Sequence, residues 1–600
     1  MSFRRGEFCI LSAVLGVALA ALPLRAAEKT TVSLAHIKLS GSLGESPPVA
    51  DPLFGGGENF KSKIDRIKQA AKDDKINALY LHLDGLRVGW AKIDELSRAI
   101  ADFRKAGKKA FAYLEAGDTK DYLLALSCDE VCLPESGWLM LTGIRAEVAF
   151  YKDLFEKIGV KADMLQMGDF KSAAEPLMRS SLSEPARKQL SAVIDDYFEK
   201  SIIERIVRLR GDKKFTAEQV KKLIDEGPYT ARGALEAGLV DRVAYPEKFR
   251  EHLKTPLKTD KIEIVKDYGK DKKKGNDLSS AFDLFKLLLD MPNKKSTSLK
   301  GPGIAVIHAV GVITTGKSEE GLFGAETVGS TTMIEAIRQA EKDDMVKAIV
   351  LRVDSPGGSA LASDLIWHEL KRSKKPIVAS MSDVAASGGY YISMAAKKIY
   401  ADPGTLTGSI GVVGGKLALG GLFDKVGIKT EIISRGANSS IFSTEKPFSE
   451  SERKAITMLM KDVYDQFLDK ALEGRQKAGK KMTRDELVKL AGGRIWTGRQ
   501  AKDNGLIDEL GGLGDAIAAA RAMTDLPADK EPELLLLPKS KGFLDSLLDD
   551  KLGSRAPALR MRSLLREVPE LQRKLRSLDG MFQLRGEPVW LTLPYQIDMD

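Results

Sequence analysis

The sequence predicts an α/β protein built from two tandem repeats, and three observations support this fold class. The chain has 600 residues, more than one hydrophobic core accommodates, since single cores stop growing at roughly 250 to 300 residues. Part of the first half recurs in the second half. Within each copy, short Val/Ile/Leu-rich runs alternate with amphipathic segments, which is typical of parallel strands joined by helical crossovers.

Two pairs of matching segments establish the duplication. Residues 229–241 contain Tyr-Thr-Ala-Arg followed by Ala-Gly-Leu-Val-Asp, and residues 496–508 repeat this order as Trp-Thr-Gly-Arg followed by Asn-Gly-Leu-Ile-Asp. Upstream, residues 72–84 and 342–354 each place Lys-Asp-Asp before an apolar run that ends in Asp. The offsets are 267 and 270 residues, so small insertions separate the two copies.

The second copy shows the alternation of elements in order. Strands are expected at 304–310, 348–353 and 376–380, because each is a short apolar run. Helices are expected between them at 334–343 and 360–372, where apolar residues recur at helical spacing. Each repeat is therefore predicted to be an α/β unit.

Composition divides the chain into five segments. The connection between the repeats is rich in Lys, Asp and Ser, with an apolar stretch at 282–289 that favours a helix. Beyond residue 536 the repeat ends, and 543–578 alternates basic residues with Leu, as in an amphipathic helix that packs on a partner rather than on a membrane. The predicted segments are 1–27 (signal peptide or N-terminal membrane anchor), 28–253 (N-terminal repeat), 254–300 (linker), 301–530 (C-terminal repeat) and 531–600 (C-terminal extension).

The first 27 residues show an export pattern. Arg4 and Arg5 precede an apolar run at 8–24, and Ala26 and Ala27 follow it. The run is shorter than the roughly 20 residues that a membrane-spanning helix prefers. A cleaved signal peptide and a retained anchor both fit, and in either case the sequence predicts an exported protein.

Bulk composition excludes several classes of protein. An apolar fraction of 43% and a charged fraction of 30% suit a soluble globular body. The net charge of +9 is modest and the basic residues are dispersed apart from 266–274, so nucleic-acid binding is not expected. After export only Cys128 and Cys132 remain, and we expect them to be reduced core residues. No His/Cys/Asp cluster has metal-ligand spacing, so neither a metal nor a cofactor is expected.

Two glycine-rich turns of the second repeat carry the candidate chemistry. The strand at 348–353 leads to Gly357 and Gly358, whose backbone N–H groups are free to point at a ligand oxygen, as in an oxyanion hole. The next strand leads to Ser387, which lies among small residues at a strand-to-helix turn, as a serine nucleophile does. Each pattern has an ordinary alternative: a tight turn for the glycines, and a helix cap for the serine.

A serine nucleophile needs a base, and histidine is the usual one. None of the five histidines lies in a turn that presents a catalytic base; they are His36, His82, His252, His308 and His368. Lysine is the remaining candidate class.

Four motifs, in order and in the expected repeats, resemble the long form of the signal peptide peptidase A family over roughly residues 31–524. They are residues 168–176 (Gly-Asp-Phe-Lys-Ser-Ala-Ala-Glu-Pro), 354–358 (Asp-Ser-Pro-Gly-Gly), 386–391 (Ala-Ser-Gly-Gly-Tyr-Tyr) and 405–411 (Thr-Leu-Thr-Gly-Ser-Ile-Gly). That family belongs to the Clp-protease and crotonase superfamily of repeated ββα spiral folds. The resemblance implies a serine endopeptidase with a Ser-Lys dyad that degrades cleaved signal peptides. It also implies a membrane-associated homotetramer at the bacterial cell envelope, in the periplasm or on the periplasmic face of the inner membrane.

The resemblance also assigns roles to particular residues. It implies that Ser387 is the nucleophile, that Lys171 is the general base and that Ser409 orients the lysine. Gly357, Gly358 and the N–H of Gly388 fall at the oxyanion hole, and which of the first two glycines donates is left open. A lysine base must be neutral, so burial has to lower its pKa from about 10.4.

The duplication tests these roles independently of the family. Under the local offset, Ser387 aligns with Thr119 and Lys171 aligns with Ser439, so each repeat lacks one half of a dyad. The sequence therefore predicts one composite site per chain. Two alternatives remain: an acyl-CoA enzyme of the crotonase type, which export disfavours because coenzyme A is cytoplasmic, and a non-catalytic envelope scaffold.

Overall fold

The computed structural model describes residues 31–47, 50–51, 55–56, 58–270, 299–319, 326–539, 587 and 589–593. Three predictions fall outside these residues: the export segment 1–27, the helix at 282–289 and the helix at 543–578. Along the described part of the chain, no helix combines the length and the apolarity needed to cross a membrane.

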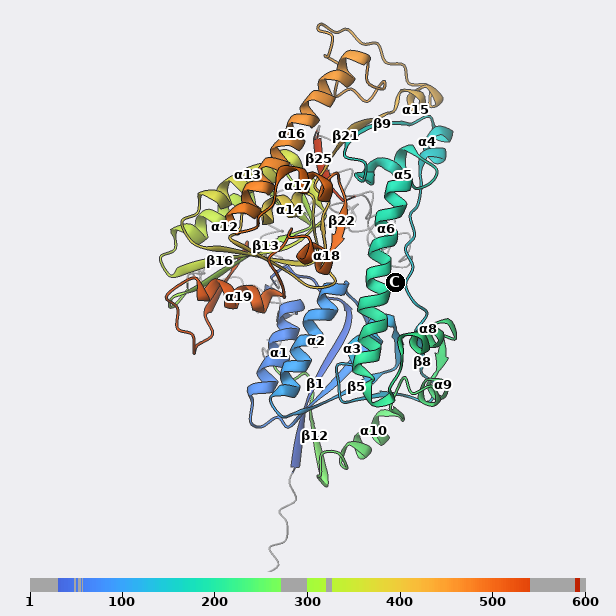
Figure 1. The fold of residues 1–600 in the computed structure, drawn as a ribbon, viewed down its shortest axis with the longest axis vertical. Helices are drawn as coiled ribbons and strands as arrows, with labels where there is room; N and C mark the ends of the chain where they lie inside the picture. Colours follow the sequence, from blue (N-terminus) through green and yellow to red (C-terminus); the bar gives the residue numbers. More distant parts are fainter. Residues whose placement is uncertain are drawn as a thin grey trace, which may run out of the picture.

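The first repeat is built on a parallel sheet with the strand order β11-β7-β5-β4-β1-β12. Its strands are β1 Thr31–Ser42, β4 Ala78–Arg87, β5 Lys109–Leu114, β7 Glu130–Leu133, β11 Arg242–Val243 and β12 Lys261–Val265. Helices α1 (Phe60–Lys72) and α2 (Trp90–Lys105) pack side by side along this sheet, in the lower part of the view in Figure 1.

The second repeat contains a sheet of the same plan. Its path is β22-β20-β18-β16-β13-β24, parallel except for the antiparallel pair β20 and β22. These strands are β13 Gly303–Val310, β16 Val346–Ser355, β18 Ile377–Ala386, β20 Leu406–Gly408, β22 Ile495–Thr497 and β24 Glu533–Leu537, with β19 Lys398–Ala401 and β23 Glu509–Leu510 attached beside β18. The order β18-β16-β13-β24 repeats the order β5-β4-β1-β12 of the first sheet, which confirms the predicted duplication.

The predicted elements of the second repeat lie where the apolar patterns placed them. Strands β13, β16 and β18 contain the expected runs, and α12 (Ser330–Lys342) and α13 (Ala360–Arg372) are the expected helices. The start of α13 follows from its sequence, because the side chain of Ser359 accepts a hydrogen bond from the N–H of Ala362, 3.2 Å away. The two-repeat α/β fold class is confirmed.

The other elements are short, apart from one long helix, α16 Glu450–Lys477. The remaining helices are α3 Thr119–Ala125, α4 Lys152–Ile158, α5 Glu175–Met178, α6 Glu184–Asp196, α7 Glu204–Leu209, α8 Ala217–Asp225, α9 Ala231–Glu236, α10 Pro246–Leu253, α14 Gly388–Ser393, α15 Gly420–Lys425, α17 Arg484–Leu490, α18 Gly498–Asp503 and α19 Leu513–Ala522; a π-helical segment at Tyr197–Ile203 joins α6 to α7, and 3-10 turns lie at Ser172–Ala174 and Gly211–Lys213. Short strands β2 Ala50–Asp51, β3 Gly55–Gly56, β6 Ala116–Asp118, β8 Trp138–Met140 and β10 Tyr229–Thr230 complete the first repeat.

A third sheet joins the two repeats. Its order is β15-β14-β17-β25-β21-β9, formed by β9 Lys161–Met167, β14 Val312–Thr314, β15 Thr327–Gly329, β17 Gly357–Ser359, β21 Val412–Ala418 and β25 Val589–Thr592. Strand β9 belongs to the first repeat and pairs antiparallel with β21 of the second, from Lys161 opposite Ala418 to Met167 opposite Val412. In Figure 1, β9, α4 and α5 reach up from the first repeat to lie beside β21.

Three strands differ from the predicted segmentation. Strand β12 falls inside the predicted linker 254–300, yet it pairs with β1 as the edge of the first sheet. Strands β24 and β25 fall inside the predicted extension 531–600, yet they pair with β13 and with β17 and β21. Composition hides β12 because this edge strand is only half-buried, so Lys261 and Glu263 alternate with apolar residues as in a surface segment.

Candidate active site

Ser387 occupies the sharp turn between β18 and α14. Its backbone has φ +55° and ψ −112°, a conformation with positive φ that residues other than glycine rarely adopt. Its N–H donates to the carbonyl oxygen of Gly408 at 2.8 Å, which fixes the turn. The Ser387 side chain makes no hydrogen bond that caps α14, so its hydroxyl is available for another partner.

That partner is Lys171, which follows β9 and begins the turn at Ser172–Ala174. The Nζ atom of Lys171 lies 2.7 Å from the Oγ of Ser387, 2.9 Å from the Oγ of Ser409 and 3.1 Å from the carbonyl oxygen of Ser409. All three residues are fully buried. The pairing of β9 with β21 brings the lysine of the first repeat into this position in the second.

Burial shifts the pKa of the lysine. The pKa of Lys171 is lowered well below its ordinary value, because the buried amine loses the solvation that its charged form needs. Its polar neighbours are two hydroxyls and a carbonyl oxygen, and these carry no net charge. Burial therefore favours the neutral form of the amine, which can accept a proton.

A second buried lysine, Lys92 on α2, provides the contrast. Its Nζ lies 2.9 Å from carboxylate oxygens of both Asp354 and Asp383 and 3.9 Å from that of Glu45. Burial opposes the charge of Lys92, but the attraction of these carboxylates outweighs it and holds the pKa of Lys92 above its ordinary value. The pKa values of two buried lysines are thus shifted in opposite directions, and the difference between them is the presence of carboxylates around Lys92.

Lys92 also ties together the two turns that form the site. Asp354 precedes the glycines of β17 and accepts a hydrogen bond from the N–H of Val384, 3.2 Å away on β18. Asp383 lies on β18, four residues before Ser387, and accepts hydrogen bonds from the N–H groups of Gly89 and Lys92, both at 3.2 Å. The first repeat therefore anchors both turns through α2.

The glycines of the second repeat approach each other closely. Gly357 has φ +99° and Gly358 has φ +156°, so both favour glycine. A Cβ on Gly357 would lie 2.7 Å from the amide nitrogen of Gly388, and a Cβ on Gly388 would lie 3.0 Å from the α-carbon of Gly357. The three predicted glycines thus converge beside Ser387. The N–H of Gly357 already donates to the Oγ of Ser355 at 3.2 Å.

Sequence reasoning missed the charged groups beneath the site. Besides Lys92 and Asp383, Arg352 is fully buried and contacts Glu45 at 2.7 Å and Glu95 at 2.6 Å. These pairs join residues that are 307 and 257 positions apart in the chain, so no local pattern reveals them. Their one sequence signal is the presence of isolated charges within apolar segments, such as Arg352 in β16.

The two aligned positions that lack a catalytic group lie apart from the Lys171 and Ser387 pair. Thr119 begins α3, and its hydroxyl donates to the carbonyl oxygens of Met140 and Gly143, both at 3.4 Å. Ser439 lies in an exposed turn of the second repeat. Within the part of the chain that the structure describes, Ser387, Lys171, Ser409 and the three glycines therefore come together at one site.

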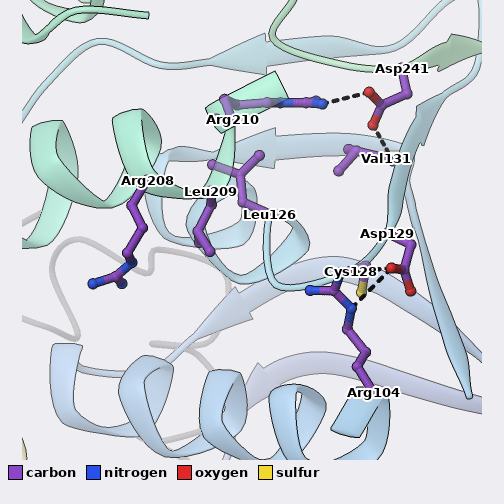
Figure 2. A pocket seen from close by; sticks show the side chains of 10 residues that line it. Arg104, Leu126, Cys128, Asp129, Val131, Arg208, Leu209, Arg210 and Asp241 are labelled. Carbon is purple, nitrogen blue, oxygen red and sulfur yellow. Dashed lines mark hydrogen bonds and ion pairs between the residues drawn. The ribbon is translucent and has the colours of Figure 1, made fainter. Parts of the chain in front are cut away.

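A pocket of about 400 Å³ lies elsewhere in the first repeat (Figure 2). Its lining residues are Arg104, Leu126, Cys128, Asp129, Val131, Arg208, Leu209, Arg210, Gly211 and Asp241. Asp129 pairs with Arg104 at 2.6 Å, and Asp241 pairs with Arg210 at 2.5 Å, so much of its charge is already neutralised. Cys128 and Cys132 are buried and free, as predicted, and burial raises the pKa of both thiols.

Comparison with known proteins shows the family of the chain. The sequence model of Peptidase family S49 matches residues 102–260 and 369–526, and that of Clp protease matches residues 325–404. The chain belongs to Peptidase family S49 and is a serine peptidase with a Clp-protease-like fold.

Three relatives show how far the similarity extends. The chain is 34% identical over 539 residues to the chloroplastic serine protease SPPA of Arabidopsis thaliana, across 89% of this chain and 76% of the relative. It is 30% identical over 548 residues to protease 4 of Salmonella typhi, across 88% of this chain and 84% of the relative. A candidate signal peptide peptidase SppA of Enterococcus faecium is 35% identical over 228 residues, across 38% of this chain and 62% of the relative.

Proposed function

We propose that the chain is an endopeptidase in which Ser387 is the nucleophile and Lys171 is the general base. The observation that carries the proposal is the distance of 2.7 Å between the Nζ of Lys171 and the Oγ of Ser387 in a fully buried site. A neutral amine at that distance can accept the hydroxyl proton directly.

The reaction follows from the positions of these groups. Lys171 takes the proton of Ser387 as the Oγ attacks the peptide carbonyl carbon, and the charge that develops on the carbonyl oxygen is stabilised by backbone N–H groups. Lys171 then gives the proton to the leaving amine. The neutral Lys171 then takes a proton from a water molecule, whose oxygen attacks the acyl carbon and releases the acyl group from Ser387, and Lys171 returns the proton to the Ser387 Oγ.

The arrangement of the glycines supports Gly358 and Gly388 as the oxyanion donors. The N–H of Gly357 donates to the Oγ of Ser355, so it is already engaged. Gly388 begins α14 immediately after the nucleophile, where a helix N-terminus also favours negative charge. Gly357 then serves to let the three backbones approach each other.

Ser409 is proposed to orient the lysine. Its hydroxyl and its carbonyl oxygen both contact Nζ, at 2.9 Å and 3.1 Å, so the amine is held from two sides. Ser409 itself has φ +53°, and its N–H donates to the carbonyl oxygen of Arg494 at 2.7 Å. This backbone conformation directs both oxygens at one atom.

The substrate class and the cellular location are proposed from the burial of the site, the relatives and the N-terminal sequence. A buried neutral lysine is favoured where an apolar substrate excludes water, which suits cleaved signal peptides and other apolar peptides. The Enterococcus faecium relative is named for that substrate class. The export pattern of residues 1–27 supports a place at the bacterial cell envelope, and the family resemblance supports membrane association and a homotetramer. We propose the domain order given above, with the first repeat carrying the base and the second the nucleophile.

Labelling with a fluorophosphonate, followed by peptide mapping, tests the proposal against both alternatives. The expected result is one modified residue, Ser387, with labelling lost in Ser387→Ala and strongly slowed in Lys171→Ala. Ser439→Ala is the matched control, because Ser439 is exposed and lies outside the site. A scaffold would not be labelled, and an acyl-CoA enzyme would turn over acyl-CoA thioesters while leaving peptides intact.

A further inference from the structure

The C-terminal strand β25 lies in the middle of the sheet that carries the glycines. It is antiparallel to both of its neighbours, β17 and β21. On one side Leu591 pairs with Gly358 and Trp590 with Ser359, and on the other side Trp590 pairs with Val413. An extended peptide inserted between two strands is a common mode of peptide recognition.

The main chain of β25 meets the glycines as a substrate would. The carbonyl oxygen of Leu591 lies so close to Gly357 that a Cβ there would be 1.9 Å from it, and the same Cβ would be 2.7 Å from the amide nitrogen of Gly388. The N–H of Leu593 donates to the carbonyl oxygen of Pro356 at 2.8 Å. Hydrogen-bonded pairs alternate with non-hydrogen-bonded pairs along antiparallel strands. Because Leu593 and Pro356 form a hydrogen-bonded pair, the pair two residues along, Leu591 and Gly358, is hydrogen-bonded as well, and the N–H of Gly358 faces the carbonyl of Leu591. The Leu591 carbonyl therefore points at the proposed oxyanion donors.

The side chains of β25 alternate between two apolar surroundings. Val589 and Leu591 join the core of the second repeat, and Leu591 is fully buried. Trp590 points the other way and packs with Met164, Ala173 and Val413. Ala173 lies two residues from Lys171, so this side of the strand touches the segment that holds the lysine. The slot therefore accepts apolar side chains on both of its faces.

The strand also packs against a site that is closed to solvent. Ser387 and Lys171 are fully buried, although a peptidase nucleophile must meet peptides from outside. Two contacts hold the start of the strand: the hydroxyl of Thr315 donates to the carboxylate of Glu587 at 2.7 Å, and the indole N–H of Trp590 donates to the carbonyl oxygen of Glu587 at 2.7 Å. The first of these contacts lies at the surface, where it can be altered without disturbing the core.

We propose that residues 589–593 are an internal substrate mimic that occupies the substrate site of the same chain. This inference rests on the proposed Ser387 and Lys171 dyad and deepens it. Substrates are extended apolar peptides that displace β25 and add as a strand between β17 and β21. The residue in the place of Leu591 supplies the carbonyl that Ser387 attacks. Residues 589–593 thus compete with substrate and set its preference for apolar side chains.

Full-length Leu591→Arg tests the proposal, with Leu591→Met as the matched control that keeps the side chain apolar. Arginine cannot occupy the fully buried position, so β25 is released. We expect the fluorophosphonate labelling rate of Ser387, and kcat/KM for an apolar reporter peptide, to rise about tenfold. The reason is that the fraction of molecules whose substrate site is free of β25 increases. The Leu591→Met variant should stay within about twofold of wild type, since volume-conserving apolar exchanges are well tolerated.

A surface variant and a competing peptide test the proposal even if Leu591→Arg does not fold. Thr315→Ala removes the contact with Glu587 and should raise the labelling rate without changing thermal stability. A synthetic peptide with the sequence of residues 587–593, Glu-Pro-Val-Trp-Leu-Thr-Leu, should compete with the reporter in Thr315→Ala, while the same peptide with Arg in place of its first Leu should not.

The outcomes separate the two proposals. Equal labelling rates in wild type, Leu591→Arg and Thr315→Ala, together with a peptide that does not compete, overturn the internal mimic but leave the dyad intact. A Ser387 that is unlabelled in every variant overturns the dyad itself.

Discussion

The amine of Lys171 lies 2.7 Å from the hydroxyl of Ser387, although 216 residues separate the two in the chain. The lysine comes from the first repeat and the serine from the second. The pairing of β9 with β21 is what spans that distance. Replacing each of the groups at this site in turn tests what it contributes to activity and stability.

Replacing the base should remove activity without unfolding the protein. We expect Lys171→Met to lower kcat/KM for a reporter peptide by about 10³-fold or more, because the two groups act as a unit. Thermal stability should hold or rise, since a buried amine without a carboxylate partner is exchanged for an apolar group of similar length. Lys161→Met, at an exposed position on β9, is the control. Retained turnover in Lys171→Met would show that the base lies elsewhere.

Activity should depend on pH through Lys171. The pKa of its amine lies well below the ordinary lysine value because the amine is buried, so the active neutral form persists at lower pH than for a surface lysine. We expect kcat/KM to fall as the pH drops below that lowered pKa. The unfolded chain binds more protons than the folded chain between the lowered and the ordinary value, so the contribution of Lys171 to stability increases with pH across that window. A profile without an acidic limb from one ionisation contradicts this assignment.

Ser409 should act on the lysine rather than on the substrate. We expect Ser409→Ala to lower kcat by about 10- to 100-fold, with little change in KM, because one of the two contacts that hold Nζ is lost. Ser409→Thr, which keeps a hydroxyl, should recover part of the loss. The acidic limb of the pH profile should shift in Ser409→Ala, which a purely structural role would not produce. An unchanged limb with a raised KM would point to substrate binding instead.

Lys92 should matter for stability first and for activity second. Lys92→Met leaves Asp354, Asp383 and Glu45 without their shared cation, and breaking a buried ion pair in this way costs about 3 to 5 kcal/mol. We expect a matching loss in urea unfolding, with slower peptide hydrolysis because the turns before Ser387 and Gly357 lose their anchor. Lys105→Met, on the exposed end of the same helix, should change neither. Unaltered stability in Lys92→Met would mean that the cluster is protonated in the folded protein.

Separated repeats should regain activity only together. Residues 28–270 and residues 295–600, co-expressed, should hydrolyse the reporter, while each alone should not, because each contributes one of Lys171 and Ser387. The first fragment must extend past 265, since β12 is the edge strand beside β1. A shorter fragment that ends at residue 253 should associate poorly. Hydrolysis by the C-terminal fragment alone would contradict the composite site.

Sequence patterns predicted the repeats and the turn that contains Ser387, because both depend on residues that are close in the chain. Apolar periodicity predicted strands β13, β16 and β18, and small residues predicted the turn. The role of Lys171 was predicted only from its resemblance to a family motif, because its burial depends on a pair of strands from different repeats. Lys92 and β25 were missed for the same reason, because their partners are distant in the chain. Asp354 and Asp383 lie 262 and 291 residues from Lys92, β25 pairs with β17 and β21, and a short apolar run carries no sign of where it will pair.

The division of the site between the repeats also bears on the history of the chain. Thr119 and Ser439 stand where a second serine and a second lysine would complete a second site. Because each copy carries a different one of the two proposed catalytic groups, neither copy can be deleted without ending the reaction. The two halves can therefore diverge in sequence as long as the surface at which they meet is kept.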